Sequence, residues 1–143
     1  MAFNTNAYNA RNIDCTFGPV ALTSGFSEGG KVTINMLEDA YSMSVGTAGE
    51  STVSVMNNES AEMIIPLKVT SSAHKEMVTL YTASKLAPSG VIFLPFTCID
   101  RVRGLKYFAP EAFIIKLPDA EYGQEAGDRE WTLNTGCMLV SPL

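Results

Sequence analysis

Polar and apolar side chains alternate along much of the segment from Lys31 to Val69. The alternating apolar positions are Val32, Ile34, Met36, Tyr41, Met43, Val45, Met63, Ile65, Leu67 and Val69. Because neighbouring side chains of a strand point to opposite faces, a period of two predicts strands that each have one apolar face. We expect these strands at about 31–37, 40–46, 50–57 and 60–70. So much strand in a short chain leaves sheet edges that need a partner.

Glycine and asparagine residues separate these strands. Gly46-Thr47-Ala48-Gly49 and Asn57-Asn58-Glu59 contain residues that tolerate a positive φ, so both predict hairpin loops. Further strands are expected at about 13–17, 20–23, 91–99, 105–109, 111–117 and 129–135. We assign no element to the apolar tail at 138–143.

One helix is expected, from Ser72 to Leu86. Ser72 is its expected N-cap, and Glu76 lies early enough to suit the positive end of the helix dipole. Met77 and Leu80 lie at helical spacing and predict an apolar stripe. Many strands and one helix predict a mainly β fold, an antiparallel sandwich or partly open barrel with the helix on one face or closing an edge.

The length of 143 residues predicts a single domain with a real core. Residues 1–12 are rich in Asn and Ala without any period, which predicts a flexible arm ahead of a β domain at 13–143. Charged residues make up 17% of the chain, against about 25% in typical domains. Because few charges are available to cover the surface, we expect apolar area that is buried against other chains.

The formal net charge of −5 argues against ordinary binding to a nucleic-acid backbone, which needs clustered Lys and Arg. One short basic cluster is present, formed by Arg101, Arg103 and Lys106, and we interpret it as a solvated turn. An acidic surface would instead repel nucleic acid, which is useful in a conduit.

No residue pattern supports catalysis. His74 is the one histidine, and its place in the first turn of an amphipathic helix predicts a surface residue. Glu38 and Asp39 are a poor acid/base pair because neighbours in a strand face opposite ways. The chain has no G-x-S-x-G motif and no phosphate or dinucleotide loop. Trp131 and Tyr122 suit a ligand platform, yet a core position is the default for tryptophan. We therefore expect a non-enzymatic protein without cofactor or metal.

The chain has three cysteines, which are widely spaced and form no C-x-x-C motif. This pattern predicts buried, reduced side chains that act as small hydrophobes. No apolar run approaches the roughly 18 residues that a membrane span requires, and the first residues lack the apolar segment of a signal peptide. We expect no membrane insertion and a cytoplasmic origin.

The order of the short motifs resembles that of the tail tube proteins of contractile-tailed bacteriophages. The resemblance covers roughly Cys15 to Leu133. Its motifs, in chain order, are Gly25-Phe26, Glu38-Asp39 with Tyr41, Val45-Gly46-x-x-Gly49-Glu50, Asn57-Asn58, Leu67-Lys68-Val69-Thr70-Ser71-Ser72, Ile99-Asp100, Ala112-Phe113-Ile114-Ile115-Lys116-Leu117-Pro118, Glu121-Tyr122-Gly123 and Arg129-Glu130-Trp131. The segment Arg101-Val102-Arg103-Gly104 departs from the family by being more basic.

The resemblance implies homohexameric rings that stack into a hollow tube for the passage of DNA into the host. Each subunit would add about four strands to one ring-wide inner β-barrel, which removes free sheet edges. Twenty-four strands tilted by roughly 40° give a backbone diameter of roughly 48 Å, which leaves room for duplex DNA. The implied partners are the tail sheath, baseplate, tail terminator and tape measure proteins and the genomic DNA. The implied location is the virion tail, assembled in the host cytoplasm.

The same resemblance implies two sets of contact residues. Carboxylates that face the lumen would repel phosphates, and our candidates for them are Glu50, Glu59 and Glu62. A slip of one residue in the strand register would reverse which side chains face inward. The candidates for contact between rings lie in the arm and the first hairpin loop, and they are Asn4, Tyr8, Gly46, Thr47 and Gly49.

Three other functions stay open at this point. A carbohydrate-binding or adhesin-like β-sandwich would need an exposed cluster of aromatic side chains. A small β-barrel enzyme would need a polar constellation that the sequence does not show. A related tube, that of a contractile injection system or bacteriocin, would share the same sequence features.

Overall fold

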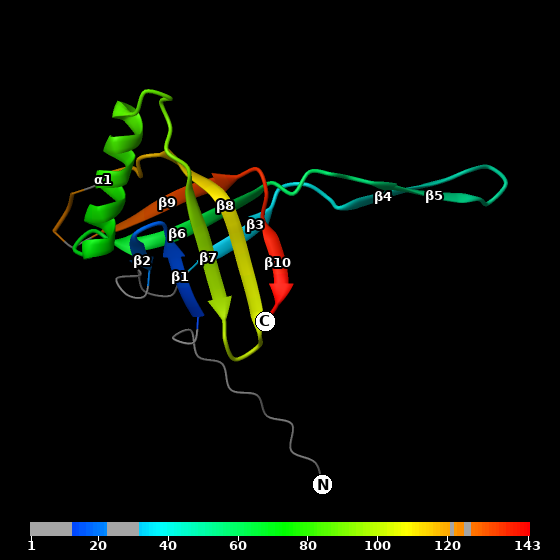
Figure 1. The fold of residues 1–143 in the computed structure, drawn as a ribbon, viewed down its shortest axis with the longest axis horizontal. Coiled ribbons are helices and arrows are strands. Elements are labelled where there is room, and N and C mark those ends of the chain that lie inside the picture. The colour runs from blue at the N-terminus through cyan, green and yellow to red at the C-terminus, as the bar shows by residue number, and fades with distance from the viewer. Residues whose placement is uncertain (1–12, 23–31, 121, 125–126) are drawn as a thin grey trace, which may run out of the picture.

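Antiparallel strands and a single helix make up the described part of the chain (Figure 1). The structure is a computed structural model, and it describes residues 13–22, 32–120, 122–124 and 127–143. The elements are β1 Ile13–Phe17, β2 Val20–Leu22, β3 Thr33–Met36, β4 Tyr41–Val45, β5 Ser51–Val55, β6 Ala61–Lys68, α1 Ser72–Leu86, β7 Leu94–Asp100, β8 Leu105–Lys116, β9 Asp128–Thr135 and β10 Leu139–Pro142. The prediction of a mainly β, antiparallel fold with one helix at 72–86 is confirmed. The predicted arm at 1–12 lies outside the described residues.

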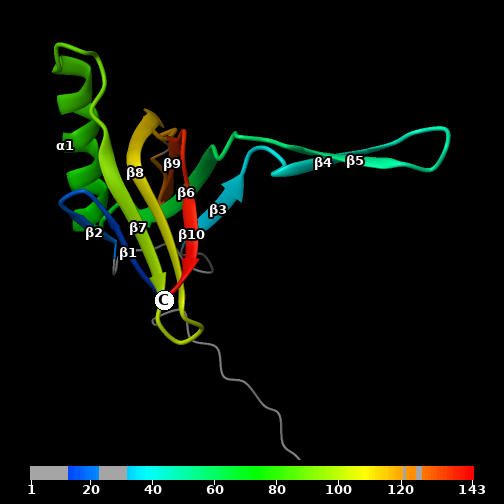
Figure 2. The ribbon, with the colours of Figure 1, turned by 45° about the vertical axis from the view of Figure 1, so that its right-hand side comes forward.

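The main sheet has the strand order β2-β1-β7-β8-β9-β6-β3, with β10 paired to β8. Strand β8 belongs to two layers: its first half pairs with β7 and β10, and its second half pairs with β9. The sheet therefore folds over along β8, and the layer β3-β6-β9-β8 crosses the layer β2-β1-β7-β8-β10 (Figure 2).

Three sequence predictions about the strands are wrong. The segment Asn57-Asn58-Glu59 does not close a hairpin, because β5 pairs with β4 whereas β6 pairs with β3 and β9. The segments 105–109 and 111–117 form one strand, because Pro110 lies where the pairing of β7 with β8 shifts register, between the pairs Phe96–Ala109 and Leu94–Ala112. A proline cannot donate to a β-ladder, and such an irregularity is where it is tolerated. The apolar tail, to which we assigned no element, contains β10.

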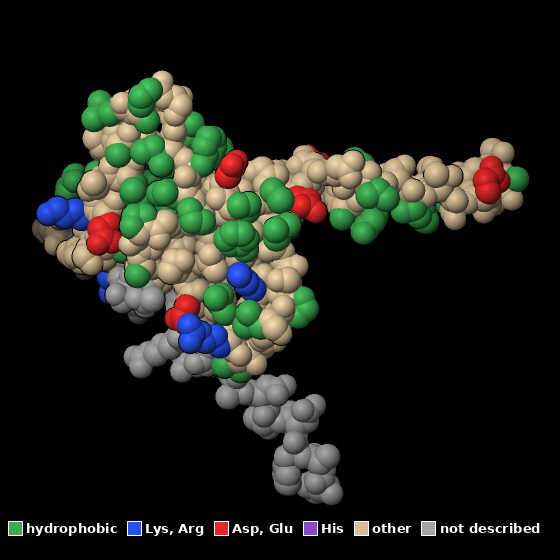
Figure 3. Space-filling view, in the orientation of Figure 1, with side chains coloured by type: hydrophobic (Ala, Val, Ile, Leu, Met, Phe, Trp, Pro, Cys, Tyr) green, Lys and Arg blue, Asp and Glu red, His purple; other side chains and the backbone are tan. Residues whose placement is uncertain are grey.

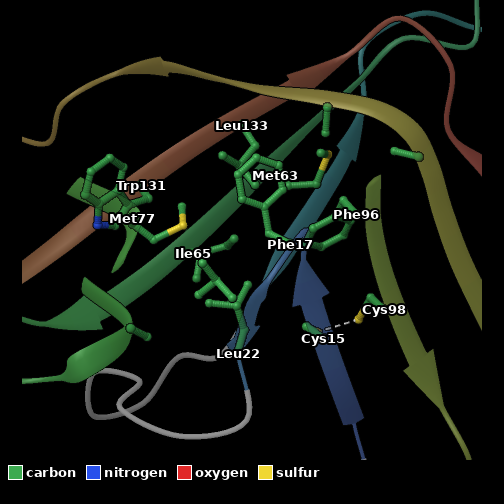
Figure 4. Packing of buried hydrophobic residues seen from close by; sticks show 14 of the residues in the cluster. Cys15, Phe17, Leu22, Met63, Ile65, Met77, Phe96, Cys98, Trp131 and Leu133 are labelled. Carbon is green, nitrogen blue, oxygen red and sulfur yellow. Dashed lines mark hydrogen bonds between the residues drawn. The ribbon is translucent and has the colours of Figure 1, made fainter. Parts of the chain in front are cut away.

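The core lies between the two layers and under the helix (Figure 4). Strand β6 alternates strictly between buried and partly exposed residues, as its period of two predicts. The largest fully buried side chains are Trp131, Phe17, Phe96, Leu22, Met63, Ile65, Leu67, Met77 and Leu133. Trp131 is fully buried whereas Tyr122 is 86% exposed, so these two aromatic side chains do not form a ligand platform.

The N-cap of α1 is Ser71 and not Ser72. The backbone N–H of His74 donates to Ser71 Oγ at 3.2 Å, and Ser71 has extended backbone angles. Glu76 lies beyond the first turn, which contains no acidic residue, so the predicted charge–dipole contact is also wrong.

We expect Ser71→Ala to lower the free energy of unfolding by about 1 kcal/mol, because it removes the acceptor of a helix N-terminal N–H. Urea unfolding followed by circular dichroism measures this loss. Ser72→Ala is the matched control, and it should change the free energy of unfolding by less than about 0.5 kcal/mol. A larger loss from Ser72→Ala than from Ser71→Ala would contradict the assignment.

His74 is half-buried beside Trp131 and is not the surface residue that its position predicts. Trp131 Nε1 donates to His74 Nδ1 at 3.1 Å, and the two ring centroids are 5.7 Å apart. Burial lowers the pKa of His74 from its usual 6.5, and the positive charge of nearby Arg129 lowers this pKa further. The neutral imidazole is the form that can accept the tryptophan N–H.

The lowered pKa predicts a pH-dependent stability. Below about pH 6.5 the unfolded chain takes up a proton at His74 that the folded chain holds more weakly. The free energy of unfolding should therefore fall as the pH is lowered from 7.5 to 5.5. His74→Gln keeps an acceptor but cannot titrate, so urea titrations of this variant should show a smaller fall over the same range. Equal slopes in both proteins would contradict this role of His74.

Candidate functional site

Strands β4 and β5 form a two-stranded hairpin that projects from the body of the molecule (Figures 1 and 2). All of their residues are exposed and none carries a charge. Cross-strand pairing places the apolar side chains together on one side, which we call the ribbon face: Tyr41, Met43, Val45, Val53 and Val55. These side chains are 59–68% exposed. The opposite side of the hairpin is polar, and it carries Ser42, Ser44, Thr52 and Ser54.

An apolar face of this kind is unfavourable in water. An isolated two-stranded hairpin is only marginally stable, and it is best stabilised when its apolar face packs on another surface. Covering the exposed part of each side chain of the ribbon face would contribute roughly 1–2 kcal/mol per side chain to the free energy of docking. Figure 3 shows apolar side chains along the ribbon, with no part of the described body packed over them. The ribbon face therefore has the features of a docking element for another chain.

Local sequence explains the shape of the ribbon. At its tip the Gly46 N–H donates to Glu50 O at 2.7 Å, and the Gly49 N–H donates to Gly46 O at 3.1 Å. Gly49 has a φ of +88°, which strongly favours glycine. The hairpin loop predicted at Gly46–Gly49 is thus confirmed, and it places the contact candidates Gly46, Thr47 and Gly49 at the tip.

The ribbon is joined to the body by backbone hydrogen bonds. The Met56 N–H donates to Ala40 O at 2.9 Å, and the Leu37 N–H donates to Ser60 O at 3.0 Å. These bonds connect the β4–β5 pair to the β3–β6 pair. Glu38 and Asp39 lie between these two bonds, where the chain changes from the main sheet to the projecting hairpin.

The structure does not gather the three candidate carboxylates into one cluster. Glu50 lies at the ribbon tip, roughly 30 Å along the extended chain from Glu59. Glu59 lies at the ribbon base, where its Oε2 accepts a hydrogen bond from Cys137 Sγ at 3.3 Å. This hydrogen bond to Glu59 is the main cause of a raised pKa of the Cys137 thiol. Glu62 lies on β6, directly opposite Asn35 on one side and Asn134 on the other.

Glu62 belongs to a largely polar sheet surface, which we call the outer face. It is the side of the layer β3-β6-β9-β8 that points away from the core. Its residues, read from the strand registers, are Thr33, Asn35, Glu62, Ile64, Pro66, Lys68, Phe113, Lys116, Asp128, Glu130, Thr132 and Asn134. Glu130 is a further carboxylate on this face, and it is not among the candidates predicted from the sequence. Its alternation with buried Arg129 and Trp131 is visible in the sequence, but its pairing with Pro66 is not.

Strands β3 and β10 lie at open edges of the sheet in the described part of the chain. Strand β3 pairs only with β6, and β10 pairs only with β8. Apolar residues at these edges are about half exposed: Met36 and Leu37 by 48% and 45%, and Leu139 and Val140 by 47% and 50%. Open, apolar sheet edges are templates for pairing with another chain. The candidates Asn4 and Tyr8 lie outside the described residues.

Arg101 and Arg103 lie in the turn between β7 and β8, as predicted, whereas Lys106 lies on β8 and is half-buried. Arg101 Nε is 3.0 Å from Asp14 Oδ2, and Arg103 Nη1 is 3.9 Å from Asp100 Oδ2. Carboxylates thus offset two of the three positive charges, which leaves little uncompensated positive charge for a nucleic-acid contact.

Within the described residues, no helix is long and apolar enough to cross a membrane. The same residues contain no group of three or more His, Cys, Asp or Glu side chains that could hold a metal ion.

Comparison with known proteins gives a consistent result. A family model described as bacteriophage PhiTE tail tube protein matches residues 4–140. The structural protein ORF10 of Pseudomonas phage KPP10 is 23% identical over 139 residues, which are 94% of this chain and 80% of that protein.

Solved structures show the same fold. The tube-terminating cap of the anti-feeding prophage has a TM-score of 0.64 at 12% identity, over 100% of this chain and 96% of that chain. A chain of the extended sheath–tube complex of the PVC extracellular contractile injection system has a TM-score of 0.60 at 11% identity, over 96% of this chain and 93% of that chain. A chain of the PVC sheath/tube terminator has a TM-score of 0.61 at 12% identity, over 96% of this chain and 98% of that chain.

Proposed function

The chain belongs to the bacteriophage PhiTE tail tube protein family, and from this premise we propose that it forms homohexameric rings that stack into a hollow tube for DNA. The family resemblance stated from the sequence is confirmed. The family is a structural one, so the expectation of a non-enzymatic protein is confirmed as well. Membership also implies a place in the virion tail. The stacking of rings and the passage of DNA are our proposal.

The observation that carries the proposal is the uncovered ribbon face. A hairpin with five apolar side chains exposed on one side and no charge in its strands needs a surface to cover it. We propose that this surface belongs to a second copy in the adjacent ring. The tip residues Gly46, Thr47 and Gly49 then reach furthest into that neighbour, and Asn4 and Tyr8 of the arm at 1–12 add to the same contact.

The layer β3-β6-β9-β8 supplies the four strands per subunit that a ring-wide inner barrel needs. Its core side is already covered, and its outer face is the largely polar one. Pairing of the open β3 edge with the next copy would continue the sheet around the ring, which satisfies the free backbone groups of that edge. The domain at 13–143 thus contributes its outer face to the bore.

The outer face makes Glu62 and Glu130 our preferred lumen carboxylates. Repeated around the ring, they would repel the DNA backbone and keep it from adhering during ejection. The outer face also carries Lys68 and Asp128 directly opposite each other, which offset one another. Glu59 and Glu50 lie at the base and the tip of the ribbon, and we place them at the rims between rings.

Charge reversal tests the position of these carboxylates. In assembled tubes, Glu62→Lys or Glu130→Lys should raise the retention of labelled duplex DNA by about tenfold or more at low salt, and added salt should remove the effect. Glu76→Lys on the exposed side of α1 is the matched control, and it should leave retention in the bore unchanged. Equal retention in all three variants would contradict a lumen position for the outer face.

The partners follow from the same placement. The similar solved structures come from a sheath–tube complex and from tube terminators. We propose a tail sheath outside the tube and a terminator at its end, together with the baseplate. Tape measure protein and genomic DNA would occupy the lumen. Assembly would take place in the host cytoplasm.

The tube of a contractile injection system is the second candidate function, because the similar solved structures include parts of such a system. The phage relative and the phage family model favour the phage tail. A carbohydrate-binding module has less support, because Trp131 is buried and does not join Tyr122 in an exposed platform.

Sedimentation velocity over a wide range of protein concentration tests the proposal. Rings or filaments that grow with concentration are expected, since an uncovered ribbon and open edges favour self-association. A stable monomer at the highest concentration would contradict it.

A further inference from the structure

Two cysteines lie directly opposite each other inside the layer β2-β1-β7-β8-β10. Cys15 of β1 is the register partner of Cys98 of β7. The Sγ of Cys15 donates a hydrogen bond to the Sγ of Cys98 at 2.8 Å (Figure 4). The two residues are 0% and 5% exposed. Their spacing along the chain gives no sign of the contact, so the sequence alone predicts two separate small hydrophobes.

Their geometry is compatible with a covalent bond. Residues directly opposite in an antiparallel pair have Cα atoms about 4.5–5.5 Å apart, and disulfides span about 4.4–6.8 Å. A disulfide has a sulfur–sulfur distance of about 2.05 Å, so the two sulfurs need to approach by only about 0.8 Å. Cys137 is engaged elsewhere, since its thiol donates to Glu59.

We propose that Cys15 and Cys98 are an oxidisable pair that closes a disulfide when the protein meets an oxidant. A small neutral oxidant, hydrogen peroxide, converts one thiol to a sulfenic acid and releases water. The second thiol attacks that sulfur, which forms the sulfur–sulfur bond and releases a second water. Two thiols are oxidised and one peroxide is reduced.

The bond would join residues that are 83 positions apart in the sequence. The loop it closes contains the ribbon, β6 and α1. Cross-linking a long loop restricts the unfolded chain, so the folded subunit should become more resistant to unfolding. The oxidation would take place when the protein leaves a reducing cell for an oxidising exterior. Only this cellular setting rests on the proposed function. The bond itself depends only on the two strands.

The test uses the full-length protein, purified with a reductant and then exposed to dilute peroxide without denaturant. Mass spectrometry should show the loss of two hydrogen atoms, and a non-reduced peptide map should show Cys15 joined to Cys98. The Tm should rise by roughly 10 °C, and a reductant should reverse the rise. The control Cys137→Ser should behave in the same way, whereas Cys98→Ala should lose the oxidant-dependent shift.

Three results would overturn the proposal. One is that Cys15 and Cys98 both remain available for alkylation after oxidation and unfolding. Another is that they accumulate as sulfinic or sulfonic acids. The third is that Cys137 is the residue cross-linked to either of them. The wild-type peptide map decides between these results and the proposal even if Cys98→Ala fails to fold. Sedimentation of the same samples reports assembly separately, so failure of this proposal is distinct from failure of the tube.

Discussion

Met43→Glu combined with Val53→Glu should abolish assembly into tubes while leaving the subunit folded. The two side chains are opposite each other in the middle of the ribbon face, and they are 68% and 59% exposed. Because neither contributes to the core, the substitutions should not change the circular dichroism spectrum or the Tm of the monomer. Burying two carboxylates against a second copy would cost several kcal/mol, which exceeds what the rest of the ribbon contributes. Electron microscopy and sedimentation measure the loss.

The polar side of the same hairpin offers a matched control. Ser44 and Thr52 are also opposite each other, one position along the ribbon. Ser44→Glu combined with Thr52→Glu adds the same charge and the same repulsion between strands, but it leaves the ribbon face intact. Tubes should still form from this control. Tubes from the Met43→Glu, Val53→Glu protein, or equal loss of assembly in both proteins, would show that the ribbon face is not the contact.

Trp131→Ala should be the most damaging single core substitution. Trp131 is the largest fully buried side chain, and its Nε1 donates to His74. Truncation leaves a large cavity and removes that hydrogen bond, so we expect a loss of about 3–5 kcal/mol in the free energy of unfolding. This is a large share of the roughly 5–15 kcal/mol of a typical domain. Urea unfolding of the monomer measures it.

Tyr122→Ala is the control for this prediction. Tyr122 is 86% exposed, and its ring lies under the Arg129 guanidinium at 5.3 Å. Its loss should cost no more than about 1 kcal/mol. A cost below about 1 kcal/mol for Trp131→Ala would show that the helix and β9 do not pack as described.

Local patterns in the sequence predict most of the elements. The alternation along β6 and the spacing of Met77 and Leu80 on α1 depend only on neighbours in the chain, and both elements are confirmed. The errors lie where tertiary contacts decide. Pro110 ends a strand by local rules, yet β8 continues through it because β7 shifts register there. Either of two adjacent serines could cap α1 by local rules. The structure has Ser71 as the N-cap, because its side chain accepts the N–H of His74.

The candidate site could be predicted only in part. The loop Gly46–Gly49 has a local signature, and it is correctly placed. The alternation at 41–45 is the same whether a strand packs on its own core or on another chain, so the projecting ribbon is not visible in the sequence. The position of Glu130 on the outer face could not be predicted for a similar reason. It depends on the pairing of β9 with β6, and these two strands are far apart in the sequence.

A cryo-electron microscopy reconstruction of the purified, full-length protein tests the central claim most directly. We expect a hollow tube of stacked sixfold rings, with a continuous inner sheet that contains β3, β6, β9 and part of β8. Glu62 and Glu130 should face the bore, and the ribbon face should lie covered on a copy in the next ring. Isolated subunits in which the body of the same chain covers the ribbon face and the β3 and β10 edges would contradict the account.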